Sequence, residues 1–412
     1  MSRVLLTWEL GLNLGHLTRL LPIAQQLRDE GHTVLVASRD VQAAATVLGR
    51  YGIPFIQAPH LPKGIALPHR PSGYADILLS QGWSDRSALW GLTQAWLNVI
   101  EMFRPDAMIL DYSPTVGLAA RIAKVPTTLV GNGFELPPET DPLPCFPGFS
   151  WATPGKAAES ERIAVANANG VLQDFRQSSI AALRDLVRDR VRMLATFPEL
   201  DHYGARSEAT YIGPLLGAIR APRVDWPPGD GAKVFACVRP DTCNVNAILG
   251  ALSKGAMRVV CVASGFDGGA LDPFRSEWVR FSAKPVYLEP LLDADLCLTY
   301  GAEGTMLRFL LAGVPQAVVP WHVETFMAAR RIEKAGLGAR LANCSDEQLA
   351  RSSLERMCRD TTLKKNVSDF ATSASVACAG QAADQAVVNA IATAQIGASD
   401  FRKETSCDSS RV

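Results

Sequence analysis

Short apolar segments alternate with amphipathic segments along the first half of the chain. Residues 3–7 and 33–38 are mainly apolar, and between them 17–31 carries apolar residues at helical spacing and ends on a glycine. Further units of the alternation are the apolar segments 52–57, 106–111, 126–132, 170–175, 192–200 and 209–216 and the helical stretches 88–103 and 114–124. Apolar strands separated by helices predict a parallel sheet that is covered on both faces.

The alternation stops at 217–233, a segment rich in Pro, Gly and charged residues that predicts an exposed linker. It restarts with apolar segments at 233–238, 257–264, 284–289, 294–300 and 315–320. The sequence therefore predicts an α/β protein with two doubly wound domains and a binding site in the cleft between them, outside the C-terminal strand ends. The predicted parts are a first domain at 1–216, the linker at 217–233, a second domain at 234–374, a helix at 375–396 that could contact either domain, and a disordered tail at 397–412.

The segment 58–100 is less regular, because it begins with four prolines between residues 58 and 74 and continues with Trp83, Trp90 and Trp96. It predicts either a surface loop followed by a helix whose tryptophans face the core, or an apolar and aromatic wall for a bound acceptor.

Composition excludes several classes of protein. The 412 residues are 48% apolar, and the 41 basic and 41 acidic residues leave no net charge, which argues against a nucleic-acid surface. The N-terminus does not resemble a signal peptide, and no apolar run is long enough to span a membrane, so we expect a soluble, cytoplasmic protein. The nine cysteines lack the paired spacing of a zinc site, which favours reduced thiols.

Four stretches, in order, resemble the nucleotide-sugar glycosyltransferases of the GT-B fold, in particular the bacterial antibiotic and plant natural-product UDP-glycosyltransferases. GHLTRLLPIAQQLRDEGHTV at 15–34 is similar to the first loop and helix of that family, and 104–130 is similar to its Pro-Asp…Asp strand and the following helix. The segments 196–216 and 293–338 resemble the end of its N-terminal domain and its donor-binding region.

The resemblance implies two Rossmann-like domains facing each other across a cleft, the first binding the acceptor and the second the donor. It also implies an inverting, metal-independent glycosyltransferase that moves a sugar from a nucleotide diphosphate to the hydroxyl of a small-molecule or lipid-like acceptor. The nucleotide sugar is then a co-substrate, and no cofactor is expected. A non-catalytic GT-B binding protein and a sugar-nucleotide epimerase remain alternatives.

Inverting transfer needs a base for the acceptor hydroxyl, and His16 is the candidate because it follows Gly15 in the loop after the first strand. Asp111 ends the strand 106–111, and the resemblance implies that it orients His16 and stabilises the imidazolium. Structural roles are the alternative: a helix N-cap for His16, and a cap of the helix near Pro114 for Asp111. Glu9 is a rival base.

The turn at 300–305 predicts a diphosphate site. Gly301 and Gly304 permit close backbone approach, and the helix that follows directs its N-terminus at the phosphates. An ordinary strand-to-helix connection capped by Thr305 is the alternative interpretation.

Several donor positions differ from the family pattern. Tyr300 stands where the family has a phosphate-binding His, and Arg308 replaces a Glu that holds the ribose. Glu324 and Thr325 stand for the Asp-Gln pair that grips the sugar, and Leu288 aligns with the Trp that stacks on the base.

Two arginines could replace the lost positive charge. Arg239 follows the first strand of the second domain, and Arg308 lies one turn into the helix after the glycine turn. A solvated helix position is the alternative for Arg308. No Asp-x-Asp motif follows the strands of the second domain, where a donor would sit, which is consistent with metal-independent chemistry.

Overall fold

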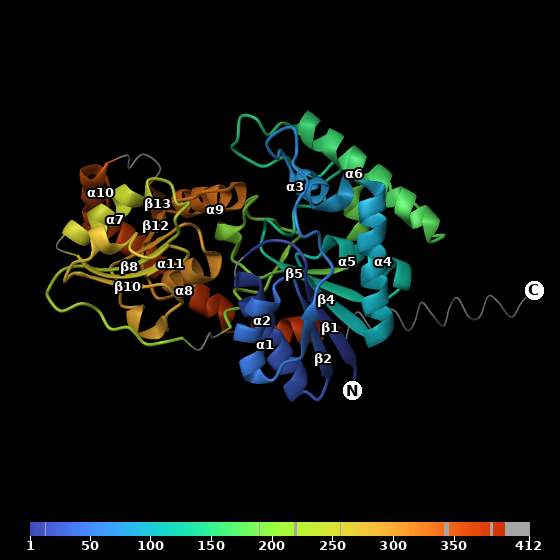
Figure 1. Cartoon of the computed structure of the whole chain (residues 1–412), viewed down its shortest axis with the longest axis horizontal. Helices are drawn as coiled ribbons and strands as arrows, with labels where there is room; N and C mark the ends of the chain where they lie inside the picture. The colour runs from blue at the N-terminus through green and yellow to red at the C-terminus, as the bar shows by residue number, and fades with distance from the viewer. Residues whose placement is uncertain are drawn as a thin grey trace, which may run out of the picture. The chain divides into compact units, whose positions relative to one another are not determined.

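The computed structural model describes residues 1–391 apart from 13, 189, 218–220, 256, 342–345, 380 and 381. The chain forms two compact units (Figure 1). The first comprises Met1–Pro198, Ala205–Gly217 and the described residues after 381, and the second comprises Glu199–Gly204 and the described residues between 218 and 380.

The first unit contains a parallel sheet of seven strands in the order β3-β2-β1-β4-β5-β6-β7. The strands are β1 (Arg3–Trp8), β2 (Thr33–Ser38), β3 (Phe55–Gln57), β4 (Ala107–Asp111), β5 (Thr127–Gly131), β6 (Val191–Leu194) and β7 (Thr210–Tyr211). The order reverses between β1 and β4, and ligands of open α/β sheets bind at the carboxyl ends of the strands at such a point.

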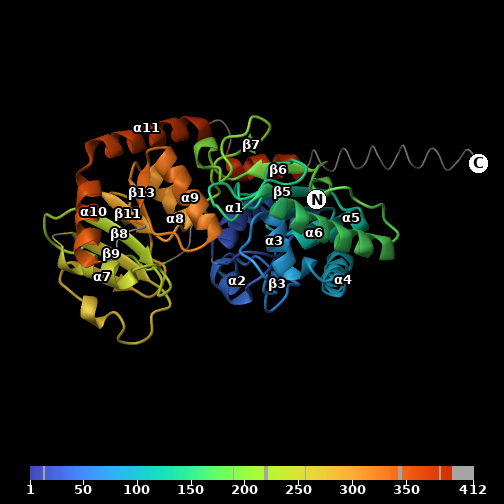
Figure 2. The same cartoon turned by 90° about the horizontal axis from the view of Figure 1, so that it is seen from above.

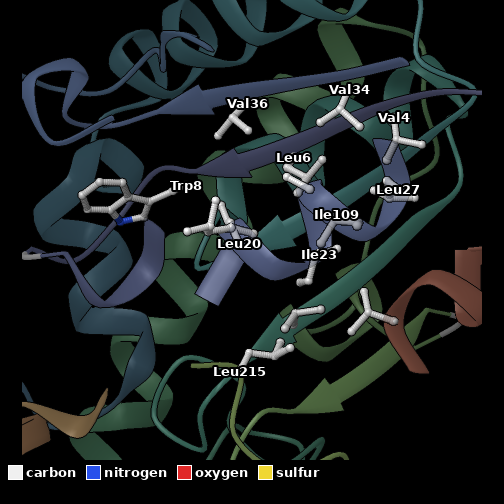
Figure 3. Packing of buried hydrophobic residues seen from close by; sticks show 14 of the residues in the cluster. Val4, Leu6, Trp8, Leu20, Ile23, Leu27, Val34, Val36, Ile109 and Leu215 are labelled. Atoms are coloured by element: carbon white, nitrogen blue, oxygen red, sulfur yellow. The ribbon is translucent and has the colours of Figure 1, made fainter. Parts of the chain in front are cut away.

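Alternate residues of the first sheet face opposite cores. Val4, Leu6 and Trp8 of β1 pack against α1 (Gly15–Asp29), as Figure 3 shows, while Leu5 packs against the opposite layer. That layer contains α4 (Arg86–Phe103) and α5 (Pro114–Ala123). Further helices of this unit are α2 (Val41–Val47), α3 (Tyr74–Leu78) and α6 (Pro154–Asp174). Both faces are covered, as the all-apolar strands predicted.

The second unit contains a parallel sheet of six strands in the order β10-β9-β8-β11-β12-β13. The strands are β8 (Lys233–Val238), β9 (Arg258–Ala263), β10 (Val279–Ser282), β11 (Leu296–Thr299), β12 (Gln316–Val318) and β13 (Gly338–Arg340). This order repeats that of the first six strands of the other sheet, with its reversal between β8 and β11. The predicted doubly wound α/β class is therefore confirmed in both units.

Helices cover both faces of the second sheet as well. One core layer contains α7 (Val245–Lys254) and α10 (Glu347–Arg359), and the other contains α8 (Glu303–Leu311). The unit is completed by α9 (Val323–Lys334) and by α11 (Thr361–Cys378), which packs against α8 and lies along this unit in Figure 2.

Two predicted strands are wrong. Residues 170–174 form the end of α6 and Phe175 caps it, because Val171 and Leu172 continue the buried stripe of a long helix. The segment 284–289 contains no strand; the third strand of this unit is β10, five residues earlier. Pro285 interrupts the segment, and the N–H of Tyr287 donates to the carbonyl of Pro222 rather than to a neighbouring strand.

The predicted helix at 375–396 is divided. Residues 375–378 end α11, and a separate helical segment covers 383–391. Val387, Val388 and Ile391 of that segment lie in the core of the first unit against α1. Residues 392–396 and the predicted tail at 397–412 lie outside the described residues.

Trp83 and Trp96 are buried in the first unit, which agrees with the structural interpretation of the segment 58–100, whereas Trp90 is partly exposed and stacks on Phe175. Among the described residues, no helix has the length and apolar character needed to cross a membrane.

Candidate active site

His16 and Asp111 meet at the strand-order reversal of the first sheet. Asp111 is the last residue of β4, and His16 is the second residue of α1, which follows the loop after β1. The two side chains are buried, and His16 Nδ1 lies 2.8 Å from Asp111 Oδ1. Neither is a helix cap, because Leu14 occupies the N-cap of α1 and Ser113 that of α5.

The surroundings of His16 favour its protonated form. Burial lowers the pKa of the imidazole, but the charge and hydrogen bond of Asp111 and the charge of Glu135 act in the opposite direction, and the pKa is raised above its usual value. With Nδ1–H donating to Asp111, the Nε2 atom is left as the basic nitrogen.

Gly11 leaves space beside this nitrogen. A Cβ atom at position 11 would lie 2.4 Å from His16 Nε2 and 3.3 Å from the Tyr112 ring. The imidazole is otherwise held by Trp8, whose ring stacks on it at a centroid distance of 5.1 Å. Tyr112, directly after Asp111, has a φ of 44°, a strained value for a residue other than glycine. A glycine at position 11 therefore keeps this side of Nε2 free of a side chain.

Arg19 and Glu135 complete this site, and the sequence analysis missed both. Arg19 Nη1 lies 2.9 Å from Asp111 Oδ1 and 2.5 Å from Glu135 Oε2. Arg19 is one helical turn after His16, and Glu135 follows the strand next to that of Asp111. Those two positional signals could have revealed them.

Glu9, the rival base, has a structural position. Its Oε2 accepts hydrogen bonds from the N–H groups of Thr115 and Val116 in the first turn of α5, at 2.9 and 3.4 Å. Burial raises the pKa of this carboxyl to about 7, although the hydrogen bonds of Thr115 and Val116 and the charge of Arg39 lower it.

The raised pKa of Glu9 predicts a pH-dependent stability. The folded protein holds the proton of Glu9 between the usual pKa of 4.5 and about 7, so its stabilising effect is present below 4.5 and is lost as the pH rises to 7. Glu9→Gln has no such loss, and its free energy of unfolding relative to the native protein should rise by about 3 kcal/mol over that range. Urea unfolding at a series of pH values measures this difference; a constant difference would contradict it.

The second unit brings a second set of residues together at its own strand-order reversal. Arg239 follows β8 and Tyr300 follows β11, and the two side chains are hydrogen-bonded. Burial raises the pKa of Tyr300 to about 12, so its phenol keeps a proton to donate. Gly301 has a φ of 101°, and a Cβ atom there would lie 2.7 Å from the side chain of Thr325.

The glycine turn leads directly into α8. Ala302 occupies the N-cap, and Gly304 and Thr305 lie inside the first turn, so the alternative cap role of Thr305 is wrong. A Cβ atom at Gly304 would meet nothing within 4 Å, which leaves open space at this helix end. Glu303, the first residue of α8, adds a negative charge there.

The other predicted donor residues have partners inside the unit. Arg308 Nη1 lies 3.4 Å from Glu289 Oε1, and Leu288 packs against the core layer that contains α8. The hydroxyl of Thr325 accepts from the N–H groups of Trp321 and His322 and donates to the carbonyl of His322. Glu324 lies in the first turn of α9.

Trp321 and His322, which the sequence analysis did not consider, lie after β12 beside this set. The Arg239 guanidinium is 5.7 Å from the centre of the Trp321 ring, and the Trp321 and His322 rings are in edge contact at 4.7 Å. Burial lowers the pKa of His322 to about 4, so this imidazole is neutral near pH 7. The sequence signal for both residues was their position directly after a strand of the second sheet.

No protein-family model and no curated protein matches the chain. Solved structures do match. The spinosyn rhamnosyltransferase SpnG is 16% identical, with 95% of this chain and 99% of that chain covered and a TM-score of 0.66. The chain has the GT-B fold.

Two other GT-B structures agree with this result. The glycotransferase of kitacinnamycin is 18% identical with a TM-score of 0.70, covering 94% of this chain and 97% of its own. The calicheamicin glycosyltransferase CalG4 is 16% identical with a TM-score of 0.68, and the match covers 96% of this chain and 98% of the CalG4 chain. The predicted resemblance in fold is thus confirmed over almost the whole chain.

Proposed function

We propose that this protein is an inverting, metal-independent glycosyltransferase that moves a sugar from a nucleoside diphosphate to a hydroxyl of a small-molecule or lipid-like acceptor. The observation that carries the proposal is the buried His16–Asp111 pair, 2.8 Å apart, with a glycine and no side chain beside the Nε2 atom of His16. A base of this kind is what attack by an acceptor hydroxyl requires.

In this proposal His16 Nε2 takes the proton of the acceptor hydroxyl while the acceptor oxygen bonds to the anomeric carbon. The bond between that carbon and the diphosphate breaks, and the nucleoside diphosphate leaves with the electron pair. Asp111 stabilises the imidazolium that forms. Attack opposite to the leaving group inverts the anomeric configuration.

The second unit supplies the donor site in this proposal. Arg239 offers positive charge, Tyr300 a hydroxyl donor, and the N–H groups around Gly304 the positive end of α8. Solved structures of SpnG and SsfS6 hold thymidine diphosphate, and one of SpnG holds spinosyn aglycone, which supports a nucleotide donor and a small-molecule acceptor.

Nucleotide binding tests the donor part. Thermal unfolding with millimolar dTDP, UDP or GDP should show stabilisation by at least one of them, because a ligand that binds only the folded protein raises its stability. Arg239→Met should weaken that effect, whereas Arg275→Met, an exposed arginine of the same unit, should not. No stabilisation by any nucleotide would contradict the proposal.

The space beside His16 gives a second test. Gly11→Ala places a methyl carbon 2.4 Å from His16 Nε2, a clash that must displace the imidazole, and we expect kcat/KM to fall by about a hundredfold or more. Gly31→Ala is the matched control, because Gly31 has a similar φ of 82° and nothing within 4 Å of its Cβ position. Steady-state kinetics on both variants separates the clash with His16 from backbone strain. Equal losses would show that Gly11 matters only for its conformation.

A non-catalytic GT-B binding protein is the second candidate. It is favoured by the donor side of the structure, where Arg308 is paired with Glu289 and the Thr325 hydroxyl is engaged within its own helix cap. Nucleotide binding without any turnover across a donor panel would support it.

A further inference from the structure

Two carboxylates and one arginine surround the imidazole of His16. Asp111 Oδ1 accepts hydrogen bonds from His16 Nδ1, at 2.8 Å, and from Arg19 Nη1, at 2.9 Å. Glu135 Oε2 is 2.5 Å from the same Nη1 atom, and Glu135 Oε1 is 3.6 Å from His16 Nδ1. The four residues come from α1, β4 and the turn after β5, and none of them is more than 7% exposed. Their charges are therefore screened little by solvent.

The chain is arranged locally to hold Glu135 in this place. Its Oε2 also accepts the N–H of Asn132 at 2.7 Å, and the Asn132 side chain in turn accepts the N–H of Glu135 at 3.1 Å. A Cβ atom at Gly131 would lie 2.7 Å from the same carboxylate oxygen, so a side chain there would displace it.

The charges of the cluster do not balance while His16 is neutral. Two carboxylates face a single guanidinium, which leaves one net negative charge in a buried site. A buried net charge is costly, and a proton on His16 cancels it. Without Glu135, the Asp111–Arg19 pair would already be neutral, and a protonated His16 would carry an uncompensated positive charge.

Glu9 and Tyr112 are two other ionisable residues in this region of the first unit. Glu9, in the loop after β1, is bound to the first turn of α5, and Tyr112 contributes a ring at 6.1 Å. His16, Asp111 and Glu135 could also be taken for a metal site, because their ligand atoms lie within 4.8 Å of one another. Arg19 Nη1, however, already contacts both carboxylates and supplies positive charge there.

We propose that Glu135 and Arg19 are positioning residues of the base: Glu135 supplies the second negative charge that favours proton uptake by His16, and Arg19 holds the two carboxylates together beside the imidazole. This inference rests on the proposed function, in which His16 is the base. Without Glu135, His16 would be a weaker base, because Arg19 offsets the charge of Asp111.

The test is a titration of His16 in the full-length chain by NMR with labelled histidine, its signal assigned by its absence in His16→Gln. Glu135→Gln should lower the pKa of His16 by about one unit, whereas Glu139→Gln, paired with Arg192 outside the cluster, should leave it unchanged. An unchanged His16 pKa in Glu135→Gln would overturn the inference. Where an acceptor is known, the acid limb of the kcat/KM profile should move in the same direction.

Arg19→Gln is a second test, in which the pKa of His16 should change in the opposite direction. It can be used if Glu135→Gln does not fold. Loss of the guanidinium should raise the pKa of His16, and Arg19→Lys should restore much of the native value.

The titration does not depend on turnover, so the two proposals can fail separately. A shifted pKa of His16 in these variants, in a protein without transferase activity, would refute the proposed function but not the electrostatic role of Glu135 and Arg19. An unshifted pKa of His16 in an active enzyme would refute only that role.

Discussion

Replacing His16 with alanine is expected to lower kcat by about two to four orders of magnitude, the usual contribution of a general base. The methyl side chain of alanine cannot accept the proton of the acceptor hydroxyl. Nucleotide binding should be unchanged, because the residues proposed to hold the donor belong to the other unit. Turnover with a verified donor and acceptor, together with nucleotide-induced thermal shifts, measures both.

His69→Ala is the control for this variant, since His69 is an exposed histidine of the same unit. It should retain full turnover. Full turnover by His16→Ala would show that another group is the base, and Glu9→Gln would then be the next variant to assay.

Asp111→Asn is expected to reduce both activity and stability. Asp111 Oδ1 accepts hydrogen bonds from His16 Nδ1 and from Arg19 Nη1. The Arg19 guanidinium is positively charged, and so is His16 once it is protonated, whereas the asparagine side chain has no negative charge to stabilise them. Hydrogen bonds to charged groups contribute about 1.5–3 kcal/mol each, so we expect the free energy of unfolding to fall by about 2–3 kcal/mol. The rate should fall as well, because the imidazolium loses its closest counter-charge.

Asp106→Asn is the matched control, because Asp106 lies just before the opposite end of β4 and is exposed, accepting the N–H of Arg3. It should change the free energy of unfolding by less than about 0.5 kcal/mol. Chemical denaturation of both variants makes the comparison. Equal stability of Asp111→Asn and the native chain would show that the buried pair is not the stabilising contact described here.

The periodicity of the sequence was sufficient for the architecture, because strands buried on both faces are apolar throughout and amphipathic helices separate them. The prediction from periodicity was wrong where the same pattern of apolar residues is compatible with two kinds of element. The apolar end of α6 has the composition of a strand, and Val286–Leu288 are apolar without having a sheet partner. The start of one helix also differs from the alternative in which Thr305 caps it: α8 already begins at Glu303, so Thr305 lies inside the helix.

The site could be predicted only in part, for a physical reason. Asp111 was predicted from its position at the end of a strand and His16 from its place after the first strand, because topology brings both to one edge of the sheet. Arg19 is in a helix and Glu135 in a turn, and their contacts depend on side-chain reach and on the absence of a Cβ atom at Gly131. Likewise, the pairing of Arg308 with Glu289 is a packing result that spacing does not encode.

Acceptor-dependent release of nucleoside diphosphate tests the central proposal most directly. The native chain and His16→Ala would be incubated with dTDP-, UDP- and GDP-sugars and a panel of small-molecule and lipid-like acceptors, and the anomeric configuration of any product determined by NMR. The proposed mechanism predicts release that requires an acceptor, gives a product of inverted configuration and is lost in His16→Ala. Release that His16→Ala retains in full, or a product of retained configuration, would contradict it.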